Sequence, residues 1–201
     1  MRKLAGLLVL LVTFASAAAA DAPSSPPKYF ESGRALKPFT FDVEEGNYQS
    51  QNVPIDCGTN AIWLKAHFTR LGKPKTKWSP LMSLGVESSN TRAVVQIVTE
   101  DFKPPLQVMI TTINLEDKND VEQVALYNTF DLETPVPVLA SWSPDGLVTF
   151  DVGGETRSVH LKGQVLQASL IGSTSAGIFD PLETGRLSGT DPTAFCTKSK
   201  P

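Results

Sequence analysis

The sequence predicts an all-β fold, an antiparallel sandwich of two sheets in the form of a jelly roll. From Phe39 onward, apolar side chains alternate with polar ones, which is the spacing of strands with one buried face. Glycine, proline, asparagine and aspartate separate these segments at short intervals. No run of ten residues has a convincing helical period. About 180 residues suffice for one such core and are too few for two.

The N-terminal part reads as an export signal followed by a leader. Arg2 and Lys3 precede an apolar run from Leu4 to Phe14, and small residues follow up to Ala20. We therefore expect a cleaved signal peptide over residues 1–20, with a retained membrane anchor as the alternative. Residues 21–34 are rich in proline and serine, so a flexible leader is predicted there and one β-sandwich domain over residues 35–198.

The strands follow from the period-two pattern. In the first clear segment Ile62, Leu64, Ala66 and Phe68 share one face, and Trp63, Lys65 and His67 share the other. Residues 121–128 also fit a helix face, and the strand is the preferred interpretation. The strands predicted after the first are 81–86, 93–99, 106–112, 121–127, 136–142, 147–152, 156–161 and 165–171.

Residues 136–161 carry the clearest local signal. Pro144-Asp145-Gly146 and Gly153-Gly154 supply the backbone freedom of tight turns between three alternating segments. A meander of three antiparallel strands is predicted.

Cys57 and Cys196 are the only two cysteines of the chain. In an oxidising compartment an even count most simply forms one disulfide, and two free thiols are the alternative. Such a bond requires the first part of the fold and the C-terminal tail to meet, with Cα atoms within about 7 Å.

Composition and charge exclude several classes of protein. Hydrophobic residues make up 41% of the 201 residues, and there are 14 glycines, a share that excludes disorder or collagen for the whole chain. Lysine and arginine number 18 against 21 aspartate and glutamate, a net charge of -3, with no long basic cluster. Nucleic acid is therefore not an expected partner.

One pattern runs through the C-terminal part of the chain: a strand ending at Trp142, the Asp145-Gly146 turn, a strand ending at Val152-Gly153, and the later Leu170–Ser173 and Gly177–Phe179 segments. This pattern resembles the concanavalin A-like lectin and glucanase superfamily, which includes laminin-G-type modules and polysaccharide lyases. The resemblance implies a curved body whose concave face binds extended sugars. The acidic strand of related glucanases is missing, and Val98 stands where alginate lyases place a histidine, so the family's catalysis is not carried over.

A ligand patch is predicted around the first clear strand. Trp63, Lys65 and His67 combine a flat aromatic ring, a cation and an imidazole, which suit a sugar ring and its hydroxyl or carboxylate groups. Arg92 and Gln96 share a parity, and a neighbouring strand would bring them beside this patch. The alternative is that Trp63 packs under a loop while Lys65 and His67 are only solvated.

Three further sites have weaker support in the sequence. A lyase would need a base and a cation, for which His67 or Tyr127 with Arg92 and Gln96 is a conceivable set. Residues 116–120 with Glu122 offer oxygen ligands for calcium, but they lack the spacing of a calcium loop, so a solvated turn is preferred and no cofactor is expected. The basic loop 73–77 with Trp78 is a further conceivable contact for an acidic glycan.

Together these features predict an exported, periplasmic or secreted, non-catalytic binding module, with carbohydrate as the best-supported ligand. A polysaccharide lyase or glycoside hydrolase on the same fold is the first alternative. A structural or partner-binding envelope protein is the second. The sequence does not predict an oligomeric state.

Overall fold

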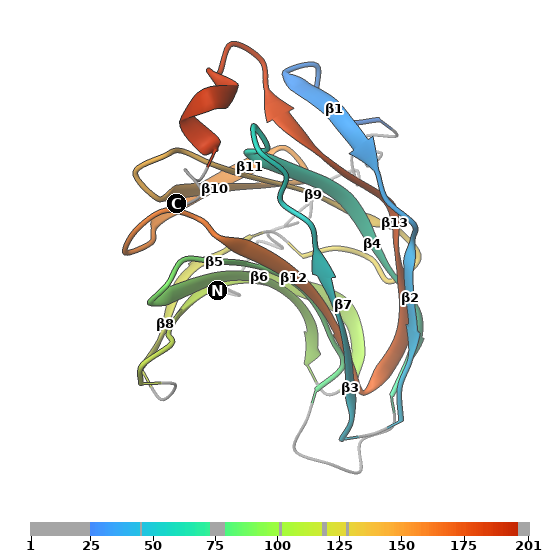
Figure 1. The fold of residues 1–201 in the computed structure, drawn as a ribbon. Coiled ribbons are helices and arrows are strands. Elements are labelled where there is room, and N and C mark those ends of the chain that lie inside the picture. Colours follow the sequence, from blue (N-terminus) through green and yellow to red (C-terminus); the bar gives the residue numbers. More distant parts are fainter. Residues whose placement is uncertain are drawn as a thin grey trace, which may run out of the picture.

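The computed structural model shows two antiparallel sheets stacked face to face (Figure 1), which confirms the predicted fold class. It describes residues 25–44, 46–72, 79–100, 102–117, 120–127 and 129–196. In these ranges no helix is long and apolar enough to cross a membrane. The predicted signal peptide, residues 1–20, lies outside the described residues.

The first sheet, sheet A, has the spatial order β1-β13-β4-β9-β10-β11, and β2 also pairs with β13. Its three-strand meander β9-β10-β11 is the one the sequence predicts, with Gly146, Gly153 and Gly154 at positive φ in the turns. The strands of sheet A are β1 Phe30–Ala35, β2 Phe39–Asp42, β4 Ala61–Leu71, β9 Val136–Trp142, β10 Leu147–Val152, β11 Glu155–His160 and β13 Ser175–Leu187.

The second sheet, sheet B, has the order β3-β12-β5-β6-β7-β8, and all its pairs are antiparallel. The neighbours β12 and β5 lie about eighty residues apart in the sequence. Local sequence patterns therefore do not predict that they pair. The strands of sheet B are β3 Tyr48–Val53, β5 Leu81–Glu87, β6 Thr91–Glu100, β7 Lys103–Asn114, β8 Val121–Leu126 and β12 Gln167–Ser173.

The core fills the space between the sheets, as period-two strands with one apolar face require. Phe39, Phe41 and Phe179 form an aromatic cluster there, with ring centroids 5.8–6.2 Å apart. Gly172 on β12 leaves room for Phe41, because a Cβ at Gly172 would lie 2.3 Å from that ring. Strands β2 and β12 of the two sheets therefore approach each other closely at this point.

The structure corrects the predicted elements in two places and confirms the preferred interpretation in a third. β1 begins at Phe30, so residues 30–34 belong to the sandwich and not to a flexible leader. β3 and the thirteen-residue β13 were not predicted, because their sequences are polar or interrupted by Gly177, Pro181 and Gly185. β8 is a strand, as preferred over the helix.

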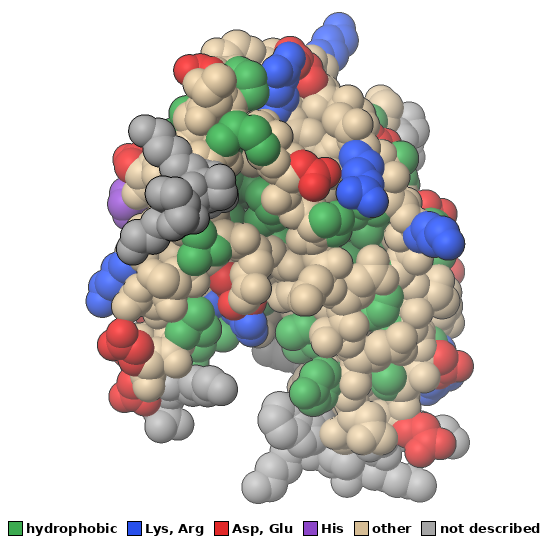
Figure 2. Space-filling model, in the orientation of Figure 1, with side chains coloured by type: hydrophobic (Ala, Val, Ile, Leu, Met, Phe, Trp, Pro, Cys, Tyr) green, Lys and Arg blue, Asp and Glu red, His purple; other side chains and the backbone are tan. Residues whose placement is uncertain are grey.

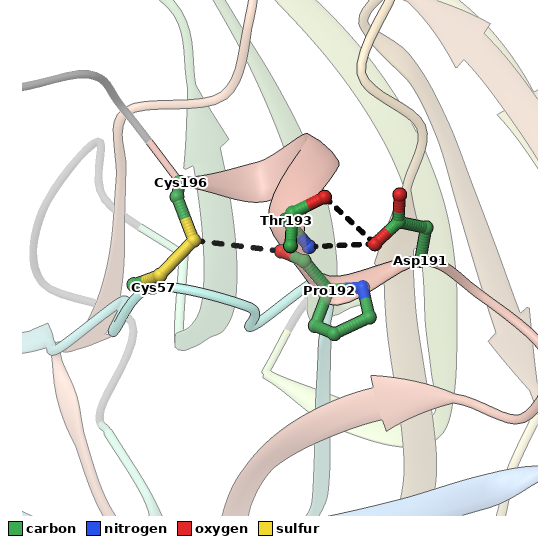
Figure 3. Close-up of a disulfide and its surroundings, with 5 residues drawn as sticks. All are labelled: Cys57, Asp191, Pro192, Thr193 and Cys196. Atoms are coloured by element: carbon green, nitrogen blue, oxygen red, sulfur yellow. Dashed lines mark hydrogen bonds between the residues drawn. A yellow bond between two sulfur atoms is a disulfide. The ribbon is translucent and has the colours of Figure 1, made fainter.

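The disulfide between Cys57 and Cys196 is present, with 4.5 Å between the Cα atoms (Figure 3). Cys57 lies in the loop between β3 and β4, and Cys196 follows the short 3-10 helix η1 Pro192–Phe195. Asp191 begins that helix by accepting hydrogen bonds from the amide and the hydroxyl of Thr193. Phe195 is buried in the core, so the C-terminal segment is held by packing as well as by the disulfide.

Candidate functional site

Sheet B is strongly bent, and its face away from the core lines the inside of an arch. Figure 1 shows this bend below β5, β6 and β12, and Figure 2 shows the same region as a hollow between two projecting ends. Residues on β5 illustrate the alternation: Met82, Leu84 and Val86 enter the core, and the residues between them face the hollow. We call this outer surface of sheet B the concave face.

Three directly paired residues cross the concave face at one end of the strands. Glu87 on β5 lies opposite Gln167 on β12 and opposite Arg92 on β6. Arg92 forms an ion pair with Glu87 Oε1, and Gln167 Nε2 donates to Glu87 Oε2 at 2.7 Å. Glu87 is only 3% exposed. Both oxygens of this buried carboxylate are therefore engaged, as burial of a charge requires.

The next row of the concave face contains unpartnered hydroxyls. Ser169 on β12 pairs with Gly85 on β5, and Thr111 on β7 pairs with Val94 on β6. Ser169 and Thr111 are 9% and 6% exposed, and their side-chain oxygens have no hydrogen-bond partner in the described structure, nor does Arg92 Nε. Each such group costs about 1–3 kcal/mol unless water or a ligand satisfies it.

The side chain of Arg92 extends from β6 over Gly85 on β5, toward Ser169 on β12. A Cβ built on Gly85 would be 3.4 Å from Arg92 Cδ and 3.4 Å from Ser169 Oγ. The aliphatic stem of Arg92 therefore passes over Gly85, which lacks a side chain that would lift it. The side chain as a whole is 28% exposed, and its Nε atom is buried.

The third row mixes polar and apolar groups. Gln96 on β6 lies between Ser83 on β5 and Met109 on β7, and it is partly exposed. In the next row Tyr48 begins β3 opposite Ser173, and it is 72% exposed. Amide groups and an open aromatic ring thus occur on the same surface.

Of the five ligand residues predicted from the sequence, only Arg92 and Gln96 lie on the concave face. Trp63, Lys65 and His67 lie on β4, on the outer face of sheet A. Two whole sheets and the core separate the two groups, so the prediction of one shared patch is wrong. The sequence predicts which residues share a face of each strand, but it does not predict the order of the strands in the sheets.

Trp63 is 2% exposed because it packs with Phe30, Leu139 and partly buried Leu187. A cavity of about 370 Å³ lies between this region and the N-terminal segment, lined by residues that include Pro26, Tyr29 and Trp63. Tyr29 holds the segment in place by donating a hydrogen bond from its hydroxyl to Asp151 at 2.7 Å. The alternative interpretation of Trp63, that it packs under a loop, is the one the structure supports.

The conceivable lyase set is not brought together either. His67 lies on the opposite side of the sandwich from Arg92 and Gln96. Tyr127 is buried in the core, where its hydroxyl donates to the carbonyl oxygen of Phe150 at 2.9 Å. Burial raises the pKa of Tyr127 well above its ordinary value, so its phenol stays protonated.

The acidic turn before β8 gives no support for calcium. Among the described residues, no group of three or more His, Cys, Asp and Glu side chains is placed to hold a metal ion. Asn114 donates from its amide to Asp120 at 3.2 Å, and Glu116 accepts from Asn90, as in a solvated, hydrogen-bonded turn. The loop 73–77 and Trp78 lie outside the described residues.

The concave face was missed by sequence reasoning in most of its members. The alternation of polar and apolar residues does predict which side chains face outward on each strand. On this face they include Glu87, Gln167, Ser169, Thr111 and Tyr48. Their convergence depends on β12 inserting between β3 and β5.

Comparison with known proteins finds similarity in architecture. No protein-family model matches the chain, and no curated protein matches it. A galectin from Caenorhabditis elegans is similar over 75% of this chain and 95% of its own, with a TM-score of 0.43 and 10% identity. An alginate lyase from Pseudomonas aeruginosa is similar over 64% of this chain and 66% of its own, with a TM-score of 0.39 and 18% identity.

The protein named BuGH16Bwt is similar over 62% of this chain, with a TM-score of 0.41 and 9% identity. The chain spans 60% of that protein's length.

Proposed function

We propose that the protein is an exported, non-catalytic binding module that holds a carbohydrate chain on its concave face. The observation that carries this proposal is the hollow of Figure 2, at the outer surface of sheet B, whose polar side chains lie in cross-strand rows. A bent sheet offers an elongated surface that a polymer can follow across the strands.

The side chains of this face match the chemistry of sugars. Gln96 and Gln167 each carry amide donors and an acceptor, which suit hydroxyl groups that also donate and accept. Tyr48 presents a ring at the edge of β3 that can pack against the apolar side of a sugar ring. Ser169 and Thr111 add side-chain hydroxyl groups in the row between those of Gln167 and Gln96.

The state of Glu87 favours binding over catalysis. Canonical glycoside hydrolysis uses a pair of carboxyl groups on either side of the scissile bond. Glu87 is the carboxylate among the described side chains of the concave face, and both its oxygens are engaged by Arg92 and Gln167. A hydrolase or lyase on this surface would need a further acid or base there.

The disulfide supports the exported location within this proposal. A bond between Cys57 and Cys196 persists in an oxidising compartment, and residues 1–20 have the pattern of an export signal. A periplasmic or secreted protein meets sugar polymers of the cell envelope or surroundings.

Calorimetric titration of the protein with oligosaccharides of several classes tests the proposal. We expect saturable binding to at least one class, and a loss of about tenfold or more in affinity for Tyr48→Ala and Gln96→Ala. Lys65→Ala is the matched control, because Lys65 lies on the opposite face, and its affinity should equal that of the parent protein. Absence of binding at millimolar oligosaccharide, or equal losses in the control, contradicts the proposal.

A further inference from the structure

Resting on the proposed function, we propose that the concave face selects uncharged, hydroxyl-rich sugar chains and rejects acidic ones such as polyuronates. The inference comes from the way charges are paired on this surface, and it names the substrate class of the same site.

The charges at the centre of the concave face cancel within one cross-strand row. Glu87 and Arg92 face each other on adjacent strands and form an ion pair, so Arg92 is already committed to a protein carboxylate. The second oxygen of Glu87 is held by Gln167 at 2.7 Å. An anionic ligand would have to compete with Glu87 for the same guanidinium group.

The remaining hydrogen-bonding groups around this pair are neutral. Ser169 and Thr111 lie in the adjacent row, and Gln96 lies in the row beyond. Hydroxyl and amide groups donate as well as accept, so the partly exposed amide of Gln96 can pair with a sugar hydroxyl in either direction. A ligand carboxylate only accepts, and it would leave the acceptor half of these groups unused.

Burial strengthens the discrimination. Glu87 is 3% exposed, and Ser169 beside Gly85 is 9% exposed, so a ligand seated on this row loses its water there. A ligand carboxylate that gives up its water on this row finds no unpaired cation in return, which costs free energy. A neutral chain meets no such penalty.

Lys103 is a further cation of sheet B, at the start of β7. It is exposed and lies in register with Glu100, at the opposite end of the strands from Arg92. An exposed lysine contributes weakly to binding an anion because salt and water screen it. It therefore adds little attraction for an acidic chain.

The test compares two sets of oligosaccharides of equal length, neutral gluco-, xylo- and manno-oligosaccharides and oligouronates, by calorimetry with the full chain at neutral pH. We expect a neutral oligosaccharide to bind, with a dissociation constant that changes less than about twofold between low salt and about 0.5 M salt. Oligouronates should bind at least about tenfold more weakly. Uronates that bind as tightly as, or more tightly than, every neutral sugar, with affinity falling as salt rises, overturn the inference and leave the proposed function standing. Binding of neither set contradicts both.

Two carboxylate variants extend the test. In Glu87→Gln the guanidinium group of Arg92 loses its carboxylate partner and is released, so oligouronate affinity should rise by about tenfold or more relative to the parent. Glu183→Gln, which changes a carboxylate on the outer face of sheet A, is the matched control and should leave both affinities unchanged. Should Glu87→Gln fail to fold, Gln96→Glu serves instead, and it should weaken oligouronate binding further. An unchanged oligouronate affinity in the folded variant contradicts the inference.

Discussion

Glu87 and Arg92 face each other directly across β5 and β6, and their ion pair sits on the inner surface of the arch and not between the sheets. Glu87 is buried by its neighbours while Arg92 stays partly exposed. The pair therefore belongs to the surface that we assign to ligand binding. The two charges lose water on a polar surface and not in the apolar core.

Removing Arg92 should destabilise the protein. Arg92→Met leaves Glu87 buried without its cation, and we expect a loss of about 2–3 kcal/mol, below the 3–5 kcal/mol of a fully buried pair because Arg92 is partly exposed. The double variant Glu87→Gln, Arg92→Met should recover most of that loss. Urea denaturation of the four proteins measures the coupling, and additive losses would show that the pair is not energetically linked.

Enlarging Gly172 should overpack the core. A Cβ there would lie 2.3 Å from the ring of Phe41, so Gly172→Ala should lower the free energy of unfolding by about 1–3 kcal/mol. Gly33→Ala is the control, because a Cβ at Gly33 would have its nearest contact at 3.4 Å. Thermal unfolding of both variants checks the difference, and equal stability would place Phe41 elsewhere.

Loss of the disulfide should lower stability without changing the fold. Cys57 and Cys196 are 139 residues apart, and the chain-entropy model gives about 4–5 kcal/mol for a closed loop of this size. The double variant Cys57→Ser, Cys196→Ser should unfold at a lower denaturant concentration and keep its β-sheet circular dichroism. A variant as stable as the parent would show that Phe195 and η1 alone hold the C-terminal segment.

Alkaline pH should release the N-terminal segment. Burial, aided by the hydrogen bond to Asp151, raises the pKa of Tyr29 from its ordinary 10.0 to about 12. A pKa raised in the folded state means that the contribution of Tyr29 is complete below pH 10 and is lost between about pH 10 and 12. Difference absorbance of phenolate in the parent and in Tyr29→Phe measures this step. Ionisation of Tyr29 near its ordinary pKa would contradict the contact with Asp151.

Sequence reasoning succeeded where structure depends on neighbours along the chain. The meander from Val136 to His160 was predicted because turn residues and alternation occur within 25 residues. It failed for β13, where the strand is broken by a bulge between Phe179 and Leu182, and for β1, whose polar sequence pairs with the distant end of β13. Such strands are defined by their partners and not by their own pattern.

The candidate site shows the same division. Alternation correctly placed Arg92 and Gln96 on one face of their strand, and Trp63, Lys65 and His67 on one face of theirs. It could not tell that these faces point in opposite directions, because the assignment of β4 to sheet A and β6 to sheet B arises from long-range pairing. The burial of Trp63 depends on Phe30 and the N-terminal segment, which the sequence placed in a flexible leader.

Mapping amide chemical shifts by NMR during titration with a neutral oligosaccharide would show whether a sugar chain binds to the concave face. We expect shifts concentrated on the paired strands β12, β5 and β6, around Ser169, Gly85 and Gln96, and none around Trp63 and Lys65 on β4. Shifts centred on β4 and the N-terminal segment, with β5 and β6 unaffected, would contradict it.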